Sequence, residues 1–84
     1  KAIADFTEVI RKPPDHADAY HYRGFGYGQL EEYDKAIADC TAAIRLDPDY
    51  ANAYHNRGTT HRKLGNDVKA DADFARAKEL GLDP

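Results

Sequence analysis

The chain has 84 residues, enough for one small domain, and a formal net charge of −3. Leu, Ile, Val and Phe number only 14, so 14 Ala and 6 Tyr supply much of the apolar volume. Ten β-branched residues are too few for a strand-rich fold. A single cysteine excludes an internal disulfide and a multi-cysteine zinc site. The mild acidity gives no footprint for nucleic acid.

The chain also lacks the apolar segments that membrane and secreted proteins carry. No apolar run approaches the roughly 18 residues of a membrane span, and no segment has the pattern of a signal peptide. We therefore expect a soluble, cytoplasmic protein that binds neither membrane nor nucleic acid. Lys1 already lies inside a helical pattern, so we also expect the chain to be part of a longer one.

The sequence repeats itself with a period of 34 residues. When it is shifted by 34 positions, 24 of the 50 overlapping pairs are identical, against roughly three or four expected from background usage. Lys-Ala-Ile-Ala-Asp at 1–5 returns at 35–39 and, in weaker form, at 69–73. A 34-residue period of this kind is typical of helix–turn–helix units stacked in one dimension.

Apolar and small residues recur at helical spacing in five segments. In chain order, the predicted helices are residues 1–12, 17–30, 33–46, 51–64 and 67–80. Pro48 ends the third of them, and Asp49 is predicted to cap the next. Small residues should let the paired helices approach closely; they are Gly24, Gly58, Ala36, Ala43, Ala70 and Ala77.

The repeat resembles the tetratricopeptide repeat family over essentially the whole chain. The family pattern runs aromatic, Leu-Gly or a variant, Tyr, Ala, aromatic, Ala and Pro. Its positions hold Tyr20, Arg23-Gly24, Tyr27, Leu30, Tyr33, Ala36, Cys40, Ala43 and Pro48, then Tyr54, Arg57-Gly58, His61, Leu64, Gly65, Ala70, Phe74 and Ala77. The chain departs from the pattern at Leu82, which stands where Pro would be. The resemblance implies an all-α fold: a right-handed α–α superhelix (solenoid) of stacked antiparallel helix pairs, with about two and a half repeats and five helices.

We expect one domain with three parts. Residues 1–16 are the second (B) helix of an incomplete repeat, 17–50 a complete A–B repeat, and 51–84 a complete repeat that ends in a capping helix. Ile37 and Ile44 occupy outward-stacking positions, and their equivalents in the last helix are Asp71 and Lys78. These charges would be costly beneath another repeat, and solenoids end with a polar face. Ordinary drift at a half-exposed position would explain the charges as well.

Several motifs could carry chemistry, and we interpret each of them as structural. Gly24-Phe25-Gly26-Tyr27-Gly28 has the spacing of a phosphate loop, but no strand precedes it and no Lys-Ser/Thr follows it. Cys40 occupies a core position with no base suggested beside it. The carboxylates show no pair suited to acid–base chemistry. We therefore expect a protein that is not an enzyme and needs no cofactor.

Some of the histidines and arginines recur at the same positions of the repeat. No two of the histidines lie at i, i+4, so there is no helix-face metal pair; they are His16, His21, His55 and His61. His21 and His55 share a repeat position, and duplication explains this as well as a metal site would. His61 stands at a family Tyr position and should be packed and partly buried. Because Arg23 and Arg57 recur together with Asp5, Asp39 and Asp73, we predict structural Arg–Asp pairs.

The resemblance also implies a concave surface, lined by the A helices, that binds extended peptides or helices of other proteins. Carried over by position, this surface is Asp18, His21, Phe25, Gly28, Gln29, Asn52, His55, Thr59, Arg62 and Lys63, with Asp49 and Tyr50 at its edge. One subgroup of the family clamps the terminal carboxylate of chaperone tails with Lys, Asn and Arg. The corresponding places here hold His21 and Phe25, then His55 and Thr59, so that clamp is absent.

The leading functional prediction is a non-enzymatic protein–protein interaction module that binds a peptide or partner surface in this groove. The alternative is a structural module whose repeats drive self-association. In that case a homodimer through residues 1–12 would cover Ile3, Phe6, Val9 and Ile10, which lack their own A helix. A third reading is a regulatory appendage of a larger protein.

Overall fold

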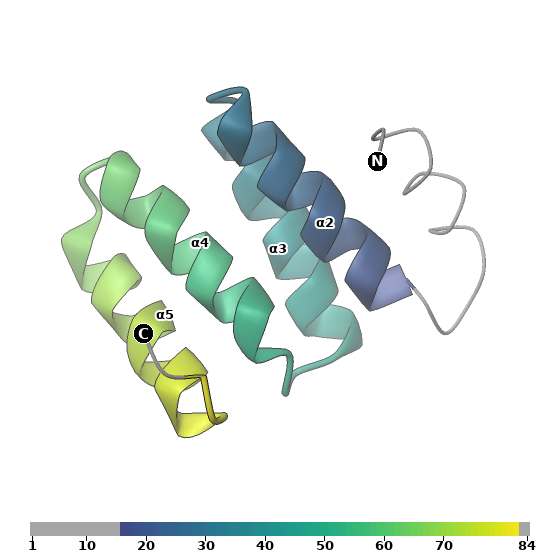
Figure 1. Cartoon of the computed structure of the whole chain (residues 1–84). Helices are drawn as coiled ribbons and strands as arrows, with labels where there is room; N and C mark the ends of the chain where they lie inside the picture. The colour runs from purple at the N-terminus through teal and green to yellow at the C-terminus, as the bar shows by residue number, and fades with distance from the viewer. Residues whose placement is uncertain (1–15, 83–84) are drawn as a thin grey trace.

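The computed structural model describes residues 16–82, which form four α-helices (Figure 1). They are α2 (His16–Gln29), α3 (Tyr33–Leu46), α4 (Ala51–Lys63) and α5 (Asp67–Glu79). No strand occurs within this range, which confirms the all-α fold, and each helix begins and ends within one residue of its predicted bounds. The fifth predicted helix, over residues 1–12, lies outside the described residues.

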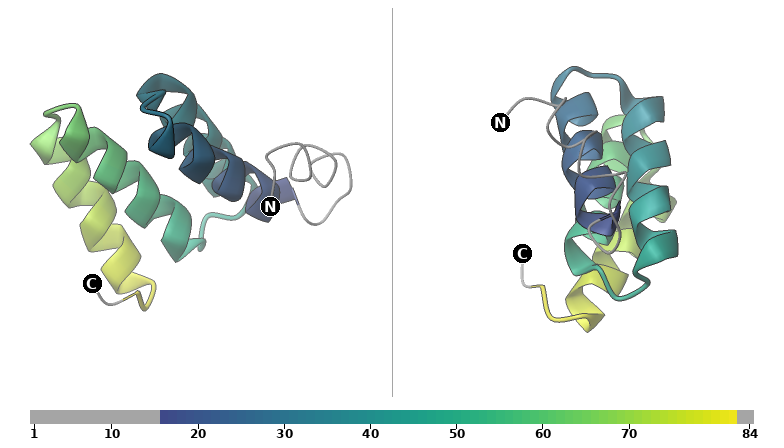
Figure 2. Two further views of the ribbon diagram at one scale, coloured as in Figure 1. Left: turned by 45° about the horizontal axis from the view of Figure 1, so that its top comes forward. Right: turned by 90° about the vertical axis from the view of Figure 1, so that its right-hand side faces the viewer.

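The helices form two antiparallel pairs that stack side by side. α2 packs on α3 and α4 on α5, while α3 also contacts α4 and a smaller contact joins α2 to α4. Figure 2 shows the pairs α2–α3 and α4–α5 as successive layers. The first helices of the two repeats, α2 and α4, are therefore neighbours.

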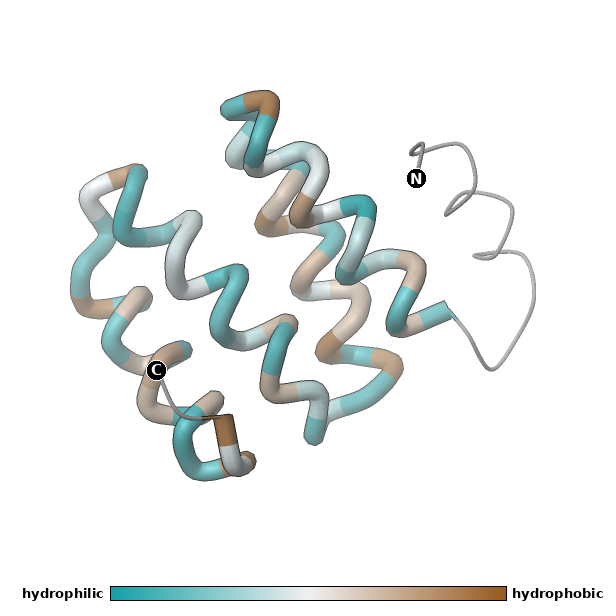
Figure 3. Tube along the Cα trace, viewed as in Figure 1, coloured by the Kyte–Doolittle hydropathy of each residue, from teal (hydrophilic) through white to brown (hydrophobic). Residues whose placement is uncertain are grey.

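The core consists of small side chains. At most 2% of the surface of Ala19, Ala36, Cys40, Ala43, Ala53, Ala70 and Ala77 is exposed. Strongly apolar residues appear only in short stretches along the chain (Figure 3), which agrees with a core that contains few large apolar side chains. Burial raises the pKa of the Cys40 thiol to about 12, so it is an inert core group, as predicted.

Two glycines lie where paired helices come closest. A Cβ atom at Gly24 would lie 3.0 Å from Asp39 Cβ and 3.1 Å from the carbonyl oxygen of Ala36. A Cβ atom at Gly58 would lie 3.0 Å from Cε1 of Phe74. These contacts are tighter than ordinary Cβ contacts, so a side chain at either position would force its neighbours to shift. The predicted role of these glycines in the close approach of the helices is confirmed.

Each helix pair contains one buried ion pair. Arg23 donates from Nε to Asp39 Oδ2 at 2.8 Å and from Nη2 to Asp39 Oδ1 at 3.0 Å. Arg57 binds Asp73 in the same way, with both distances 2.8 Å. Both carboxylates are buried, so these bidentate pairs satisfy charges that would otherwise be costly. The predicted Arg–Asp pairing is confirmed for these residues, whereas Asp5 lies outside the described range.

The turns after α2 and α4 have the same backbone but different residues. The left-handed position holds Glu31 in the first turn, at φ 61°, and Gly65 in the second, at φ 83°. The predicted cap at Asp49 is wrong. Tyr50 is the N-cap of α4 and makes no side-chain cap bond, while the Asp49 amide donates to Asp47 Oδ1 at 3.1 Å. The helix nevertheless begins at Ala51, as predicted, so only the capping residue differs.

Replacing Ala36 by Leu should destabilise the fold by about 1–3 kcal/mol, because added methylenes would overpack the contact between α2 and α3. Ala38→Leu is the matched control, since Ala38 is exposed on the same helix. Urea unfolding of the two variants measures the difference. Equal midpoints would show that Ala36 does not limit the approach of the helices.

Replacing Glu31 by Gly should stabilise the protein by about 0.5–1 kcal/mol. The left-handed backbone costs an L-residue roughly 1–2 kcal/mol, and the greater chain entropy of glycine offsets part of the gain. The reverse change, Gly65→Glu, should lower the unfolding midpoint. A loss of stability in Glu31→Gly would contradict this account.

Candidate binding groove

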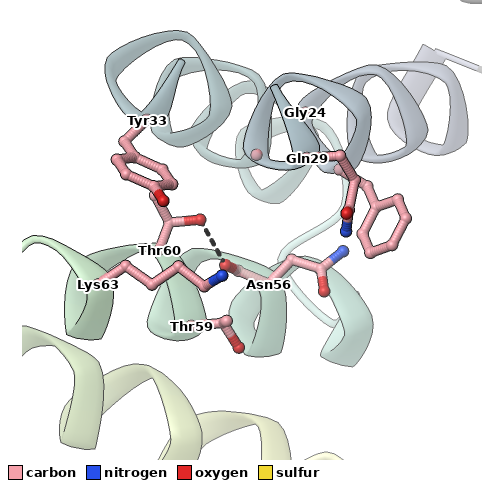
Figure 4. A pocket seen from close by; sticks show the side chains of 9 residues that line it. Gly24, Gln29, Tyr33, Asn56, Thr59, Thr60 and Lys63 are labelled. Atoms are coloured by element: carbon pink, nitrogen blue, oxygen red, sulfur yellow. Dashed lines mark hydrogen bonds between the residues drawn. The ribbon is translucent and has the colours of Figure 1, made fainter. Parts of the chain in front are cut away.

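α2, α4 and the start of α3 enclose a pocket, called here the groove pocket (Figure 4). It is lined by Gly24, Phe25, Gly28, Gln29, Tyr33, Asn56, Thr59, Thr60 and Lys63. In Figure 4 the side chains of Gln29, Asn56 and Lys63 reach into the same space between α2 and α4. The groove pocket thus combines two carboxamides and one ammonium group.

Gly28 leaves the groove pocket without a side chain at its position on α2. A Cβ atom there would meet only the Cβ of Ala36, at 4.0 Å, which is ordinary contact. Packing therefore does not require this glycine, unlike Gly24, although a glycine inside a helix costs about 1 kcal/mol relative to alanine. Its effect is to keep space open in the groove pocket.

A polar relay joins α2 to α4 beside the groove pocket; it consists of Asp18, Tyr50, His21 and Asn56. The Tyr50 hydroxyl lies 2.6 Å from Asp18 Oδ1 and 3.2 Å from His21 Nδ1. Nε2 of His21 lies 2.6 Å from Nδ2 of Asn56. Only 6% of the His21 surface is exposed. This predicted groove residue is therefore almost wholly buried between α2 and α4, where both ring nitrogens are bonded and it lines the hollow beside the groove pocket.

The other predicted groove residues do not all line the groove pocket. Phe25, Gly28, Gln29, Thr59 and Lys63 line the groove pocket, and Asn52 lines a shallow hollow beside it together with His21 and Phe25. His55 and Arg62 instead face Phe74 of α5. The rings of His55 and Phe74 are 5.3 Å apart, and Arg62 lies 5.0 Å from the centre of the Phe74 ring while donating to Asp71 at 2.6 Å. Asp49 lies in the turn before α4, bonded to Asp47.

Sequence reasoning missed four residues of the groove pocket, namely Gly24, Tyr33, Asn56 and Thr60. Helical spacing contained a signal for Asn56. Asn52, Asn56, Thr59 and Lys63 lie at i, i+4, i+7 and i+11, so they form one stripe of α4, whereas His55 and Arg62 form the neighbouring stripe. The predicted set mixed these two stripes.

Burial and hydrogen bonding shift the pKa values of the relay. Burial lowers the pKa of His21, although the nearby Asp18 carboxylate opposes that effect. Burial and the bond to Asp18 raise the pKa of Tyr50. Burial also lowers the pKa of His61, which is 9% exposed and has no hydrogen-bond partner for Nδ1 in the described part of the chain.

Between residues 16 and 82, no group of three or more His, Cys, Asp and Glu side chains could hold a metal ion. None of the four described helices is long and apolar enough to cross a membrane.

Comparison with known proteins identifies the family. A tetratricopeptide repeat model matches residues 17–50, and a second model of the same repeat matches residues 40–72. The chain belongs to the tetratricopeptide repeat family. The helix pairs described above are therefore tetratricopeptide repeats, and the predicted resemblance is confirmed. No match was found among curated proteins.

Several solved structures have the same fold. The second tetratricopeptide repeat domain of Spaghetti (RPAP3), bound to the HSP90 peptide SRMEEVD, is 32% identical with a TM-score of 0.86, over 95% of this chain and 70% of that one. The Arabidopsis OM64 domain is 32% identical with a TM-score of 0.88, over 95% and 66% of the two chains. MamA is 29% identical with a TM-score of 0.82, and this chain covers 46% of it.

The stability of this tetratricopeptide repeat domain should fall on acidification. Because the folded pKa of His21 lies below its ordinary value of 6.5, the unfolded chain binds the proton more readily. Stability is complete above about pH 6.5 and is lost as the pH falls from there toward the folded pKa, by about 1.4 kcal/mol for each unit of lowering. His61 acts in the same direction.

Urea unfolding at pH 8 and pH 5 measures this effect. His21→Gln should reduce the difference in unfolding free energy between the two pH values. His55→Gln, which changes a histidine outside the relay, is the control. An unchanged pH difference in His21→Gln would contradict the assignment.

Proposed function

We propose that this domain is a non-enzymatic protein-interaction module that binds an extended peptide in the groove between α2 and α4. The observation that carries the proposal is the groove pocket, which has open space at Gly28 and polar side chains around it. Further support comes from the RPAP3 domains, both of which are described as bound to a peptide.

The side chains around the groove pocket suit a peptide with apolar and acidic groups. Phe25 is 51% exposed and offers an apolar face. Lys63 is the one charged side chain that lines the groove pocket, and it forms no ion pair with another described residue. An apolar ligand side chain against Phe25 and an acidic group near Lys63 would complement these two residues.

We do not extend the proposal to the peptide SRMEEVD itself. The positions that a carboxylate clamp would use hold His21, Phe25, His55 and Thr59, and His21 is buried with both ring nitrogens bonded. This peptide is therefore a useful comparison probe, and it should bind more weakly than a peptide selected on the domain.

Self-association is the competing proposal, and regulation of a larger protein by this domain is a third. The surface predicted for a homodimer, residues 1–12, lies outside the described residues. Light scattering separates the first two proposals, because a monomer that binds peptides fits a recognition module, whereas a stable dimer that selects no peptide fits a structural one.

The test is selection of peptides from a random display library on the immobilised domain, followed by fluorescence anisotropy with labelled copies. Phe25→Ala should weaken binding by roughly tenfold, because a half-exposed aromatic ring that becomes covered contributes on the order of 1–2 kcal/mol. Val68→Ala is the control, since Val68 is 85% exposed and lies on α5. Equal affinities of the two variants would place the peptide elsewhere.

A further inference from the structure

Asn56 belongs both to the polar relay and to the groove pocket. Its Nδ2 lies 2.6 Å from Nε2 of His21, and the residue lines the groove pocket and the hollow beside it. No described residue donates a hydrogen bond to its Oδ1. The carboxamide therefore has one end committed to His21 and the other available to a ligand.

The direction of every hydrogen bond in the relay follows from Asp18. An ionised carboxylate only accepts, so the Tyr50 hydroxyl must donate to Asp18 Oδ1. The Tyr50 oxygen then has lone pairs for His21, so Nδ1 carries the proton and donates to it. In a neutral imidazole Nε2 is consequently an acceptor, and Asn56 donates to it from Nδ2. With a neutral imidazole, this is the only arrangement in which each group has a partner of the opposite type.

We propose that Asp18, Tyr50 and His21 are positioning residues that turn the carbonyl oxygen of Asn56 toward the groove, where it accepts an N–H group of a bound peptide backbone. The ligand part of this inference rests on the proposed function. An acceptor at this point favours a backbone amide and disfavours a carbonyl or carboxylate group, which would place two acceptors together.

The position of Lys63 agrees with this assignment. Lys63 follows Asn56 by seven residues on α4, which is about 10 Å along the helix. A peptide of about three extended residues spans that distance. Such a segment can offer an N–H donor at Asn56 and an acidic acceptor at Lys63, so the two residues would also set the direction in which the peptide runs.

Protonation of His21 would reverse the polarity presented to the groove. With protons on both ring nitrogens, Nε2 can no longer accept from Asn56, and the carboxamide must turn and present Nδ2 instead. The groups that face His21 are Asp18 and Tyr22 on its own helix, and Tyr50 and Asn56 from the α4 side. Asp18 is the only carboxylate among them, and it already accepts the hydrogen bond from the Tyr50 hydroxyl.

The relay can be tested without any ligand by NMR of the histidine ring nitrogens, which distinguishes the two tautomers. At pH 8 the parent should show His21 with the proton on Nδ1 alone. Tyr50→Phe removes the hydroxyl that imposes this choice, so both tautomers should appear, while Tyr20→Phe removes a hydroxyl outside the relay and should change nothing. A proton on Nε2 in the parent, or the same single tautomer in Tyr50→Phe, would overturn the proposal.

Asp18→Asn offers a second variant that keeps the fold, because Asp18 is exposed. An asparagine can donate to the Tyr50 oxygen, which frees the hydroxyl to donate to Nδ1. The Nε2-protonated form should therefore gain population, and the side-chain NH₂ signals of Asn56 should shift with it. Unchanged His21 and Asn56 signals would contradict control by Asp18.

The ligand part is tested with a peptide selected on the domain, methylated in turn at each backbone nitrogen. Methylation at one position should weaken binding to the parent by roughly threefold to tenfold, the value of one hydrogen bond. The same methylation should have little effect on Asn56→Ala. If no position is coupled to Asn56 in this way, the assigned N–H contact is wrong. If no peptide is selected, the proposed function fails, and the tautomer measurement still decides whether the relay exists.

Discussion

The close approach of helices within each pair is the constraint on which the rest of the structure depends. A Cβ atom at Gly24 or Gly58 would lie 3.0 Å from a side-chain atom of the paired helix, and most of the buried apolar residues are alanines. Small side chains bury little apolar area, so such a core gains stability from dense contact between backbones more than from large apolar groups. An added methyl group at either glycine would therefore force its neighbours on the paired helix to shift.

The buried Arg–Asp pairs follow from that constraint. Asp39 Cβ lies against Gly24 and Asp73 Cβ against Gly58, so each carboxylate is positioned by the same crossing that excludes a side chain opposite it. Arg57 also donates to Thr41 at 3.3 Å, which links the second ion pair to α3 of the first repeat. Because a buried pair adds little net stability but penalises misplacement of either partner, we interpret these pairs as setting the orientation of the helices that form the groove.

The 34-residue period and helical spacing were sufficient to predict the helices and the Arg–Asp pairs, because both depend on features that recur with the repeat. The relay could not be predicted in this way. It joins Asp18 and His21 of α2 to Asn56 of α4 and to Tyr50, the N-cap of α4, so its bonds lie between the two helix pairs and not within one of them. Spacing gives the stripe of a helix on which a residue lies, but it does not say which neighbouring helix will cover that stripe. It therefore predicts His21 as a groove residue but not its burial between α2 and α4.

Residues at equivalent positions of the two repeats are the same at the helix crossings and different in the groove. Positions at the helix crossings hold the same residue in both repeats, as in Gly24 and Gly58, Ala36 and Ala70, or Asp39 and Asp73. Groove positions differ instead: the pairs are Asp18 and Asn52, Tyr22 and Asn56, Phe25 and Thr59, Gly28 and Arg62, and Gln29 and Lys63.

His21 and His55 are an exception, because they are predicted groove positions that hold the same residue in both repeats. They are identical, yet the first is buried between Tyr50 and Asn56, whereas the second packs on Phe74. The role of a side chain in this array therefore depends on which residues the following helix brings to it. The helix crossings of the two repeats have the same backbone geometry and therefore require the same small residues. A ligand that lies across both repeats would instead contact different side chains in each repeat. If the groove binds a peptide as proposed, unlike side chains on like helices would fix the register and the direction of that peptide.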